Sequence, residues 1–276
     1  MDKIENLFDL TGRVAVITGG SGLLGQQHAE AIARAGGIPV LADIRINGID
    51  PRSQVWNERF GKQAWAIQTD ITDPQSVKNL LAAVLDRYGR VDILVNNAAN
   101  NPKMEDKTDV EFSRLEFFPL DQWDTDLNVG LKGAFLCSQV IGSEMAHRKR
   151  GVIVNVASDL AVIAPDQRLY RKTGLPEDRQ PVKPVTYSVV KTGLIGLTRY
   201  LATYWADRGI RVNAISPGGV YNNQPDDFVE RLSSLIPLGR MANANEYQAA
   251  ILFLCSDASS YMTGTNLVID GGRSCW

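Results

Sequence analysis

Two residues at the start of a predicted helix could exchange a proton with a substrate. Tyr187 and Lys191 are four positions apart, and residues at this spacing share one face of a helix. A tyrosine alone is a poor base at neutral pH, because its ordinary pKa is about 10. A lysine ammonium one turn away favours the phenolate. The spacing therefore predicts an acid/base pair, although surface neighbours often show the same spacing by chance.

A glycine-rich segment could hold the phosphates of a dinucleotide. Gly20, Gly22 and Gly25 follow a predicted strand and precede a predicted helix, in the spacing G-x-G-x-x-G. Glycines allow a tight turn, and the start of the helix offers unpaired N–H groups to a pyrophosphate. Asp43 ends the next strand, where its carboxylate could accept hydrogen bonds from ribose hydroxyls and would repel a 2′-phosphate. We expect NAD rather than NADP, with Arg45 close enough to leave NADP open.

Short apolar runs alternate with longer amphipathic ones along the whole chain. This alternation predicts a parallel sheet covered by helices on both faces, which is an α/β doubly wound fold of Rossmann type. The predicted strands are 14–18, 38–42, 64–68, 93–95, 152–156, 212–215 and 266–269. The predicted helices are 26–35, 74–88, 120–147, 187–207 and 245–256. In such folds ligands bind beyond the carboxyl ends of the strands.

The composition is that of an ordinary globular protein. Of 276 residues, 44% are hydrophobic and 22% charged, and the formal net charge is −2. This balance argues against nucleic-acid or membrane partners, which usually need a basic excess. Three widely spaced cysteines suggest neither a disulfide framework nor a zinc site, and we expect no metal. No signal peptide or apolar membrane-spanning run is evident, so the expected location is the cytoplasm.

These motifs occur together in an order that resembles the classical short-chain dehydrogenase/reductase family. Besides the glycine loop and the Tyr187–Lys191 pair, the resemblance rests on short motifs that mostly follow predicted strands. They are Asp70-Ile71, Asn96-Asn97-Ala98-Ala99, Asn128-Val129-Gly130, Asn155-Val156-Ala157-Ser158, Pro217-Gly218 and the segment 264–272. The resemblance implies one domain over residues 1–276, with sheet order 3-2-1-4-5-6-7 and insertions near 100–118 and 164–184. It also implies a homodimer or homotetramer formed through the helices at 120–147 and 187–207.

The resemblance also implies a role for individual residues. Ser158 would hydrogen-bond the substrate oxygen, Tyr187 would be the general acid/base, Lys191 would tune Tyr187 and bind the nicotinamide ribose, and Asn128 would anchor a water that relays protons. The expected cofactor-binding residues are Gly19, Ser21, Gly22, Leu24, Asp43, Ile44, Asp70, Ile71, Asn97, Ala98, Ala99, Tyr187, Lys191, Pro217, Gly218 and Val220.

The chain departs from the family pattern in three places. Leu23 stands where the classical loop has glycine. No threonine follows Pro217-Gly218, so backbone groups such as those of Val220 would hold the carboxamide of the nicotinamide. Ser158 and Tyr187 are separated by 28 residues, well beyond the family's usual gap, which leaves Ser188 as an alternative hydroxyl.

The extra segment between Ser158 and Tyr187 is rich in prolines and basic residues. Both of its ends are fixed beside the predicted reacting centre, so we expect it to cover the substrate pocket. Arginine binds carboxylates and phosphates in a bidentate manner. We therefore expect one or more of Arg168, Arg171 and Lys172 to contact a polar or anionic substrate group, although a solvated charged loop is an equal alternative.

Two classes of function remain. The first is a nicotinamide-dependent oxidoreductase that interconverts a secondary alcohol and a ketone on a polar, sugar-like or anionic small molecule. The variant loop and the long insertion are similar to members associated with unusual-sugar biosynthesis. The second is a non-catalytic nucleotide-binding protein, a sensor or an assembly subunit. The set Asn128, Ser158, Tyr187 and Lys191 favours the enzyme, because a binding protein would not need all four.

Overall fold

The computed structural model describes residues 4–46, 58, 64–100 and 113–276. Its parallel strands form one sheet in the order β3-β2-β1-β4-β5-β6-β7, as predicted. They are β1 (Val14–Thr18), β2 (Ile38–Asp43), β3 (Trp65–Gln68), β4 (Ile93–Asn96), β5 (Gly151–Val156), β6 (Ile210–Pro217) and β7 (Asn266–Ile269). The predicted insertion at 100–118 falls mostly on 101–112, outside the described residues.

The helices agree with the predicted ones apart from one addition. They are α1 (Leu23–Arg34), α3 (Pro74–Tyr88), α4 (Leu120–Leu127), α5 (Gly133–Cys137), α6 (Ser143–His147), α7 (Val185–Tyr204), α8 (Asp226–Ser233) and α9 (Gln248–Cys255). Two π-helical turns, Asn128–Lys132 and Ser138–Gly142, join α4, α5 and α6 into one helical span. The sequence prediction missed α8.

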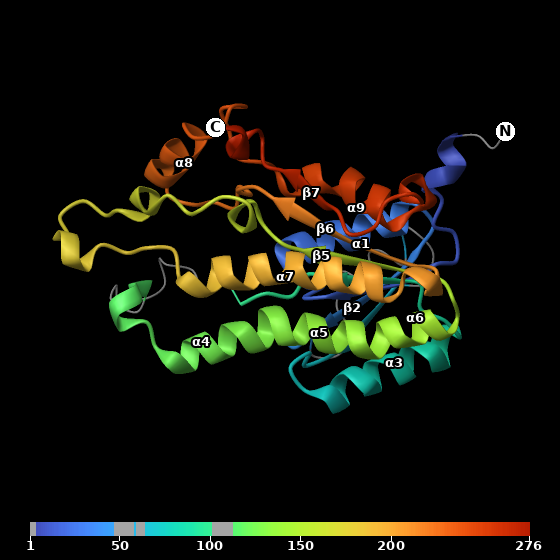
Figure 1. Cartoon of the computed structure of the whole chain (residues 1–276). Helices are drawn as coiled ribbons and strands as arrows, with labels where there is room; N and C mark the ends of the chain where they lie inside the picture. Colours follow the sequence, from blue (N-terminus) through green and yellow to red (C-terminus); the bar gives the residue numbers. More distant parts are fainter. Residues whose placement is uncertain (1–3, 47–57, 59–63, 101–112) are drawn as a thin grey trace.

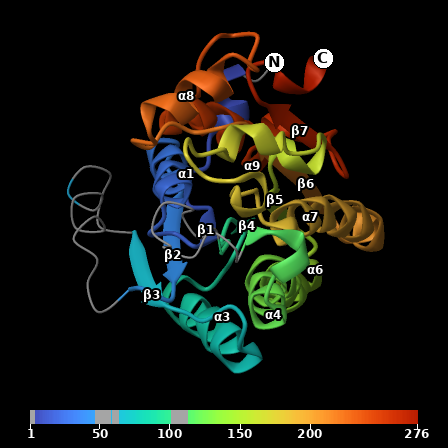
Figure 2. The same cartoon turned by 90° about the vertical axis from the view of Figure 1, so that its left-hand side faces the viewer.

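The helices cover both faces of the sheet (Figures 1 and 2). Alternate strand residues point to opposite faces, so β1 sends Val14 and Val16 to one core and Ala15 and Ile17 to the other. The first core also contains buried residues of α3, of the α4–α6 span and of α7. The second contains buried residues of α1 and α9. This double covering explains why the central strands are continuous apolar runs.

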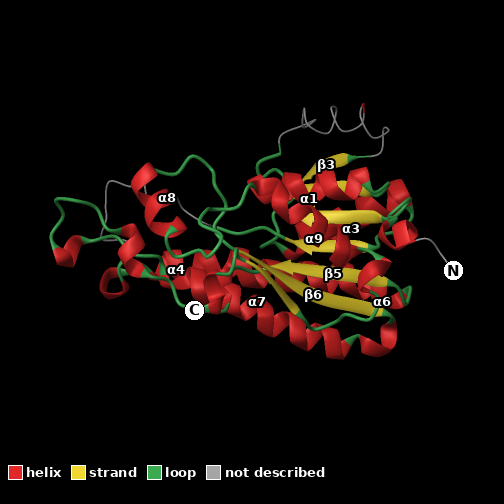
Figure 3. Ribbon diagram, turned by 90° about the horizontal axis from the view of Figure 1, so that it is seen from above, coloured by secondary structure: helices red, strands yellow, loops and turns green. Residues whose placement is uncertain are grey.

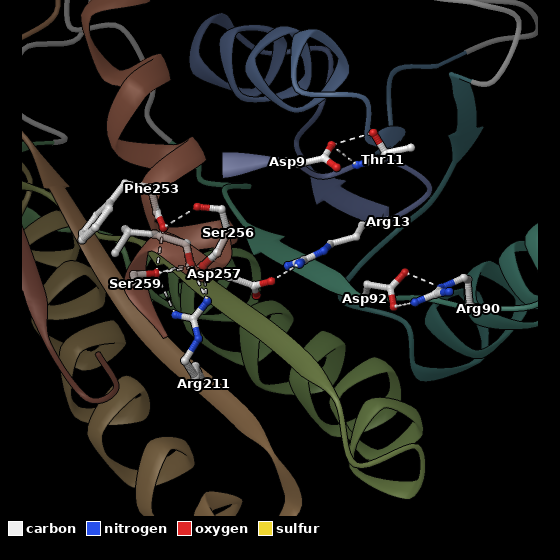
Figure 4. A network of polar contacts seen from close by, with 11 residues as sticks. Asp9, Thr11, Arg13, Arg90, Asp92, Arg211, Phe253, Ser256, Asp257 and Ser259 are labelled. Carbon is white, nitrogen blue, oxygen red and sulfur yellow. Dashed lines mark hydrogen bonds and ion pairs between the residues drawn. The ribbon is translucent and has the colours of Figure 1, made fainter. Parts of the chain in front are cut away.

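The amino ends of the strands are tied by a network of polar contacts, part of it exposed (Figure 4). Arg13 Nη2 lies 2.5 Å from Asp257 Oδ2, and Arg211 donates to Ser259 Oγ and to the Ser256 carbonyl. Asp92 accepts hydrogen bonds from Arg90 and from the Val14 N–H. These contacts join residues of separate elements, which is typical of a structural network.

The carboxyl ends of the strands lie at the opposite end of the sheet. Helix α8 and the long loop that precedes α7 extend beyond this end (Figure 3). Helix α7 begins immediately after Pro184, which places Tyr187 in its first turn at this end of the sheet. The candidate site therefore lies where parallel sheets bind their ligands. None of the helices in the described part of the chain is long and apolar enough to cross a bilayer.

Candidate active site

The glycine loop between β1 and α1 is packed too closely for side chains. A Cβ atom on Gly19 would lie 2.8 Å from the Ala98 Cα, and one on Gly25 would lie 2.3 Å from the Gly19 carbonyl oxygen. Gly19 also has a φ of 60°, which favours glycine. Asn97 Nδ2 holds the loop by donating to the carbonyls of Thr18 and Gly19, at 3.0 and 3.1 Å.

Helix α1 starts directly after this loop. Gly22 is its N-cap and supplies no side-chain hydrogen bond, so the first N–H groups of the helix are not capped by a side chain. Such groups are ready donors to an anion. The loop and helix together fit a pyrophosphate.

Asp43 lies at the end of β2 beside the loop. It accepts hydrogen bonds from the Ser21 N–H at 3.1 Å, the Ser21 hydroxyl at 2.5 Å and the Arg45 N–H at 3.0 Å. Burial alone would raise the pKa of Asp43, but these hydrogen bonds outweigh it and hold the pKa below its usual value. The ionised carboxylate borders a cavity of about 610 Å³ that Ile44, Asp70 and Ile71 also line.

A second cavity, of about 400 Å³, surrounds Tyr187. Leu23 and Ala99 line both cavities, so the two adjoin across the carboxyl edge of the sheet. Two adjoining compartments, one beside Asp43 and one beside Tyr187, fit a molecule with two nucleotide halves. The second cavity is also lined by several predicted cofactor residues, namely Leu24, Asn97, Lys191, Pro217, Gly218 and Val220.

Ser158, Tyr187 and Lys191 meet in the second cavity. A hydrogen bond joins the hydroxyls of Ser158 and Tyr187. Lys191 is buried, and its Nζ donates to the Val156 carbonyl at 2.7 Å. The alternative Ser188 does not line this cavity; its hydroxyl is buried elsewhere without a hydrogen-bond partner among the described residues.

The pKa values at this site differ from the sequence expectation. Burial raises the pKa of Tyr187, the Ser158 hydrogen bond lowers it, and the charge of Asp159 raises it further; the net shift is upward. Burial and the nearby Lys183 lower the pKa of Lys191 to about 8. The expected depression of the Tyr187 pKa is therefore absent from the protein alone, because burial dominates.

Asn128 does not face the Tyr187–Lys191 pair. Its side chain is exposed, at the start of the first π-helical turn. Asp126 and Gly130 lie on the opposite side of the helical span, where they line a cavity of about 10 Å³ together with Lys191. A Cβ atom on Gly130 would lie 2.4 Å from Val190 Cγ1, so the glycine allows this helix and α7 to approach closely. A position two residues away points to the other side of a helix, which is why the sequence prediction failed here.

Arg168, Arg171 and Lys172 do not line the second cavity. Arg168 forms a bidentate pair with Asp166 and is 77% exposed, and Arg171 pairs with Glu177. Lys172 is exposed at a turn that Gln180 closes by bonding to its backbone. The local acidic residues thus neutralise both arginines, and the middle of the insertion turns away from the cavity.

The two ends of the insertion do line the cavity, through Leu169 and Tyr170 at one end and Lys183 at the other. Leu169 packs in a cluster with Leu232 of α8, and the Tyr170 ring lies 5.7 Å from that of Phe228. The insertion therefore borders the cavity through its two ends, whereas we expected the whole segment to cover it.

Sequence reasoning missed a buried ion pair beside Ser158. Asp159 Oδ2 lies 2.8 Å from Arg273 Nη1, with side chains only 4% and 8% exposed. Asp159 Oδ1 accepts hydrogen bonds from the Ser158 hydroxyl at 2.8 Å and from the Leu160 N–H at 2.9 Å. The adjacency of Asp159 to Ser158 was the one available signal. Arg273 gave none, because it comes from the far end of the chain.

Among the residues that the structure describes, no three His, Cys, Asp or Glu side chains come together as a metal site. His28 is buried in α1, whereas His147 is exposed at the end of α6.

The chain matches two family models. Residues 13–170 match a model described as short chain dehydrogenase, and residues 178–274 match one described as enoyl-(acyl carrier protein) reductase. It is 35% identical over 270 residues to an NAD-dependent glycerol dehydrogenase of Listeria innocua, covering 96% of this chain and 95% of that one. It is 34% identical over 271 residues to a D-threitol dehydrogenase of Mycolicibacterium smegmatis, covering 96% and 94%.

A solved structure agrees with these matches. A gluconate 5-dehydrogenase from Burkholderia cenocepacia, in complex with NADP and tartrate, superposes with a TM-score of 0.86 at 26% identity, covering 99% of this chain and 100% of the other. The chain belongs to the classical short-chain dehydrogenase/reductase family. It is thus a nicotinamide-dependent oxidoreductase that interconverts a secondary alcohol and a ketone.

Proposed function

We propose that the protein oxidises a secondary hydroxyl of a polyol or sugar derivative with NAD as the hydride acceptor. The observation that supports this most directly is that Ser158, Tyr187 and Lys191 line a cavity adjoining the compartment that fits the adenosine half of a dinucleotide. The relatives named above, which act on glycerol and threitol, support a small polyhydroxylated substrate. The preference for NAD rests on the ionised, partly desolvated Asp43.

In this proposal the side chains handle the proton. Tyr187 accepts the proton of the substrate hydroxyl as the carbonyl forms and returns it in the reverse reaction. Ser158 donates its single hydroxyl proton to Asp159 in the free protein, and it would hydrogen-bond the substrate oxygen once this hydroxyl turns from Asp159 to the substrate. Lys191, held at the Val156 carbonyl, stabilises the phenolate by its charge. Bound NAD would take the hydride from the carbinol carbon, and its positive ring would favour the phenolate against the effect of burial.

The remaining cofactor residues are proposed to act mainly through shape and backbone. Gly19, Gly22 and Ser21 border the pyrophosphate, Asp70 and Ile71 the adenine, and Asn97, Ala98 and Ala99 the middle of the cofactor.

We also propose a homodimer or homotetramer, which the exposed Tyr200 and Tyr204 on α7 support. A cytoplasmic location is supported by three unpaired cysteines.

The test is Tyr187→Phe, compared with Tyr170→Phe as a control in the same cavity. NADH formation is measured across a panel of polyols and sugar derivatives, and NADH binding by fluorescence. We expect Tyr187→Phe to lower kcat by at least about a hundredfold while NADH binding persists, because only the proton-transfer group is lost. Tyr170→Phe should keep most of the activity. Undiminished turnover by Tyr187→Phe would exclude Tyr187 as the acid/base, and wild-type binding without turnover of any compound would favour the non-catalytic alternative.

A further inference from the structure

The cavity around Tyr187 is bordered by a group of apolar and aromatic side chains from separate parts of the chain. They come from the first end of the insertion, from α8 and from the segment that follows α8, and we call them the apolar wall: Leu169, Tyr170, Phe228, Leu232 and Met241. The leucines and the methionine are buried in one cluster, against which the two aromatic rings pack. The wall is therefore a packed surface and not a set of scattered side chains.

The local structure of two short helices sets the wall in place. Leu169 and Tyr170 end the 3-10 helix Gln167–Tyr170, which contacts α8. Phe228 and Leu232 are four residues apart in α8 and so share one face of that helix. The rings of Tyr170 and Phe228 lie 5.7 Å apart, and both side chains are only half-buried although they line the cavity. Part of each ring is thus available to a ligand.

The wall extends close to the reacting groups. A Cβ atom on Gly219 would lie 2.7 Å from Leu232 Cδ2 and 3.4 Å from Met241 Cε, so this end of the wall touches the backbone after β6 that lines the same cavity. At the other end, burial raises the pKa of Tyr170, and the charges of Arg273 and Tyr187 also act on it. Tyr170 therefore lies near the predicted acid/base.

The chemistry of the wall favours an apolar ligand group. Four of its five side chains, those of the leucines, Phe228 and Met241, carry no strong hydrogen-bonding group. A substrate hydroxyl placed against them would lose its hydrogen bonds to water without replacing them, which is unfavourable. An alkyl or aryl group at the same place would gain from leaving water.

We propose, building on the function above, that the apolar wall binds an apolar substituent of the substrate, so that the preferred substrate is a polyol or sugar derivative carrying an alkyl or aryl group near the reacting carbinol. The proton chemistry takes place at Ser158 and Tyr187, while the substituent rests on the rings of Tyr170 and Phe228. An unsubstituted polyol leaves this contact unused.

The experiment uses a series of diols that share one reacting carbinol and differ only in apolar length. They are single enantiomers of 1,2-propanediol, 1,2-butanediol, 1,2-pentanediol and 1,2-hexanediol, with glycerol and D-threitol as unsubstituted polyols. For each, kcat/KM with NAD is measured for the wild type, Phe228→Ala, Phe228→Leu and Val229→Ala. Val229 is the matched control, because it is a half-buried neighbour on α8 that packs against the same cluster but is not among the described lining of the cavity. Calorimetry measures binding of the diols to the NADH-loaded protein, which does not depend on turnover.

We expect kcat/KM of the wild type to rise about two- to fourfold with each added methylene, the usual effect of moving a methylene from water to an apolar surface. Binding should show a more negative heat-capacity change along the series, which is the signature of apolar burial. Phe228→Ala should reduce the rise to under about 1.5-fold for each methylene. Phe228→Leu should keep part of the rise, and Val229→Ala all of it.

Several results would overturn the proposal. A flat diol series in the wild type would do so, as would a rising series that Phe228→Ala leaves unchanged or lowers by the same factor for every diol. If Phe228→Ala does not fold, Met241→Ala and the wild-type series decide in the same way. Turnover of glycerol or D-threitol with a flat diol series would refute this inference and leave the proposed function standing. Diol binding that tightens with length and loses this trend in Phe228→Ala, without turnover of any compound, would support the inference and refute the proposed function.

Discussion

Removing Arg273 should expose how strongly the end of the chain supports the active site. Arg273 Nη1 is 2.8 Å from Asp159 Oδ2, and both side chains are almost completely buried. Arg273→Met would leave the buried Asp159 carboxylate without its counter-ion. Breaking a buried ion pair from one side costs about 3–5 kcal/mol of unfolding free energy, because the remaining charge stays desolvated. We expect a loss in this range for Arg273→Met.

The matched change on the other side is Asp159→Asn. Asparagine has nearly the same shape and keeps an oxygen that can accept the bonds from Ser158 and the Leu160 N–H. Combining it with Arg273→Met removes both charges, so the double variant should regain most of the lost stability. The coupling energy from this double-mutant cycle should be about 2 kcal/mol or more. Urea unfolding followed by circular dichroism measures all four proteins.

Measurements of kcat test whether Asp159 acts on catalysis, because a purely structural ion pair would not affect kcat. Asp159 accepts a hydrogen bond from the Ser158 hydroxyl, so Asp159→Ala should lower kcat more than Asp159→Asn, by about tenfold, with a smaller change in KM. A coupling energy under about 0.5 kcal/mol would show that the two residues act independently. Equal kcat values for the alanine and asparagine variants would show that Asp159 does not position Ser158.

Two other residues give predictions of their own. Asp43→Ala should lower kcat/KM with NAD by at least about tenfold, because charged hydrogen bonds to the ribose are lost. The variant should also show a smaller preference for NAD over NADP than the wild type. Arg45→Ala is the control. Equal use of both cofactors by the wild type would contradict the role of Asp43. Burial lowers the pKa of His28 to about 3, and its ring nitrogens have no hydrogen-bond partner among the described residues. Below about pH 6.5 the unfolded chain binds a proton that the folded chain does not, so stability should fall by roughly 2 kcal/mol by pH 5 and continue to fall towards pH 3. His28→Leu should remove this part of the acid sensitivity and His147→Leu should not, as measured by unfolding at pH 5 and 7; identical slopes in the two variants would refute it.

The parts of the fold that could be predicted are those that local sequence patterns determine. The strand at 14–18 and the helix at 74–88 match the structure to the residue, because a fully buried strand is a continuous apolar run and α3 has clear end signals. Asp73 caps α3 by accepting from the Gln75 N–H, and Gly89 ends it with a φ of 70°. Helix α8 was missed because it is short and mostly polar, with only Leu232 fully buried.

The candidate site divides in the same way. Asp43 and the glycine loop were predictable because their contacts lie within one strand–turn–helix unit. Asn128 was assigned by motif, and the helical phase that turns it to solvent appears only when the π-helical turn is placed against α7. Lys183 and Arg273 reach the cavity through tertiary packing, to which no sequence spacing points.

The cofactor compartment and the cavity around Tyr187 are built in different ways. The compartment beside Asp43 is bordered by the glycine loop and the ends of β2 and β3, whose geometry follows from the sheet itself. The wall around Tyr187 includes side chains from three separate segments, namely the insertion through its two ends, α8, and the segment after β7. Leu169 and Tyr170 pack on α8, while Arg273 neutralises Asp159, so each segment fixes a side chain contributed by another. A change in any one segment would alter the shape or charge of the cavity without disturbing the cofactor compartment. We infer that substrate choice in this protein depends on contacts between these segments.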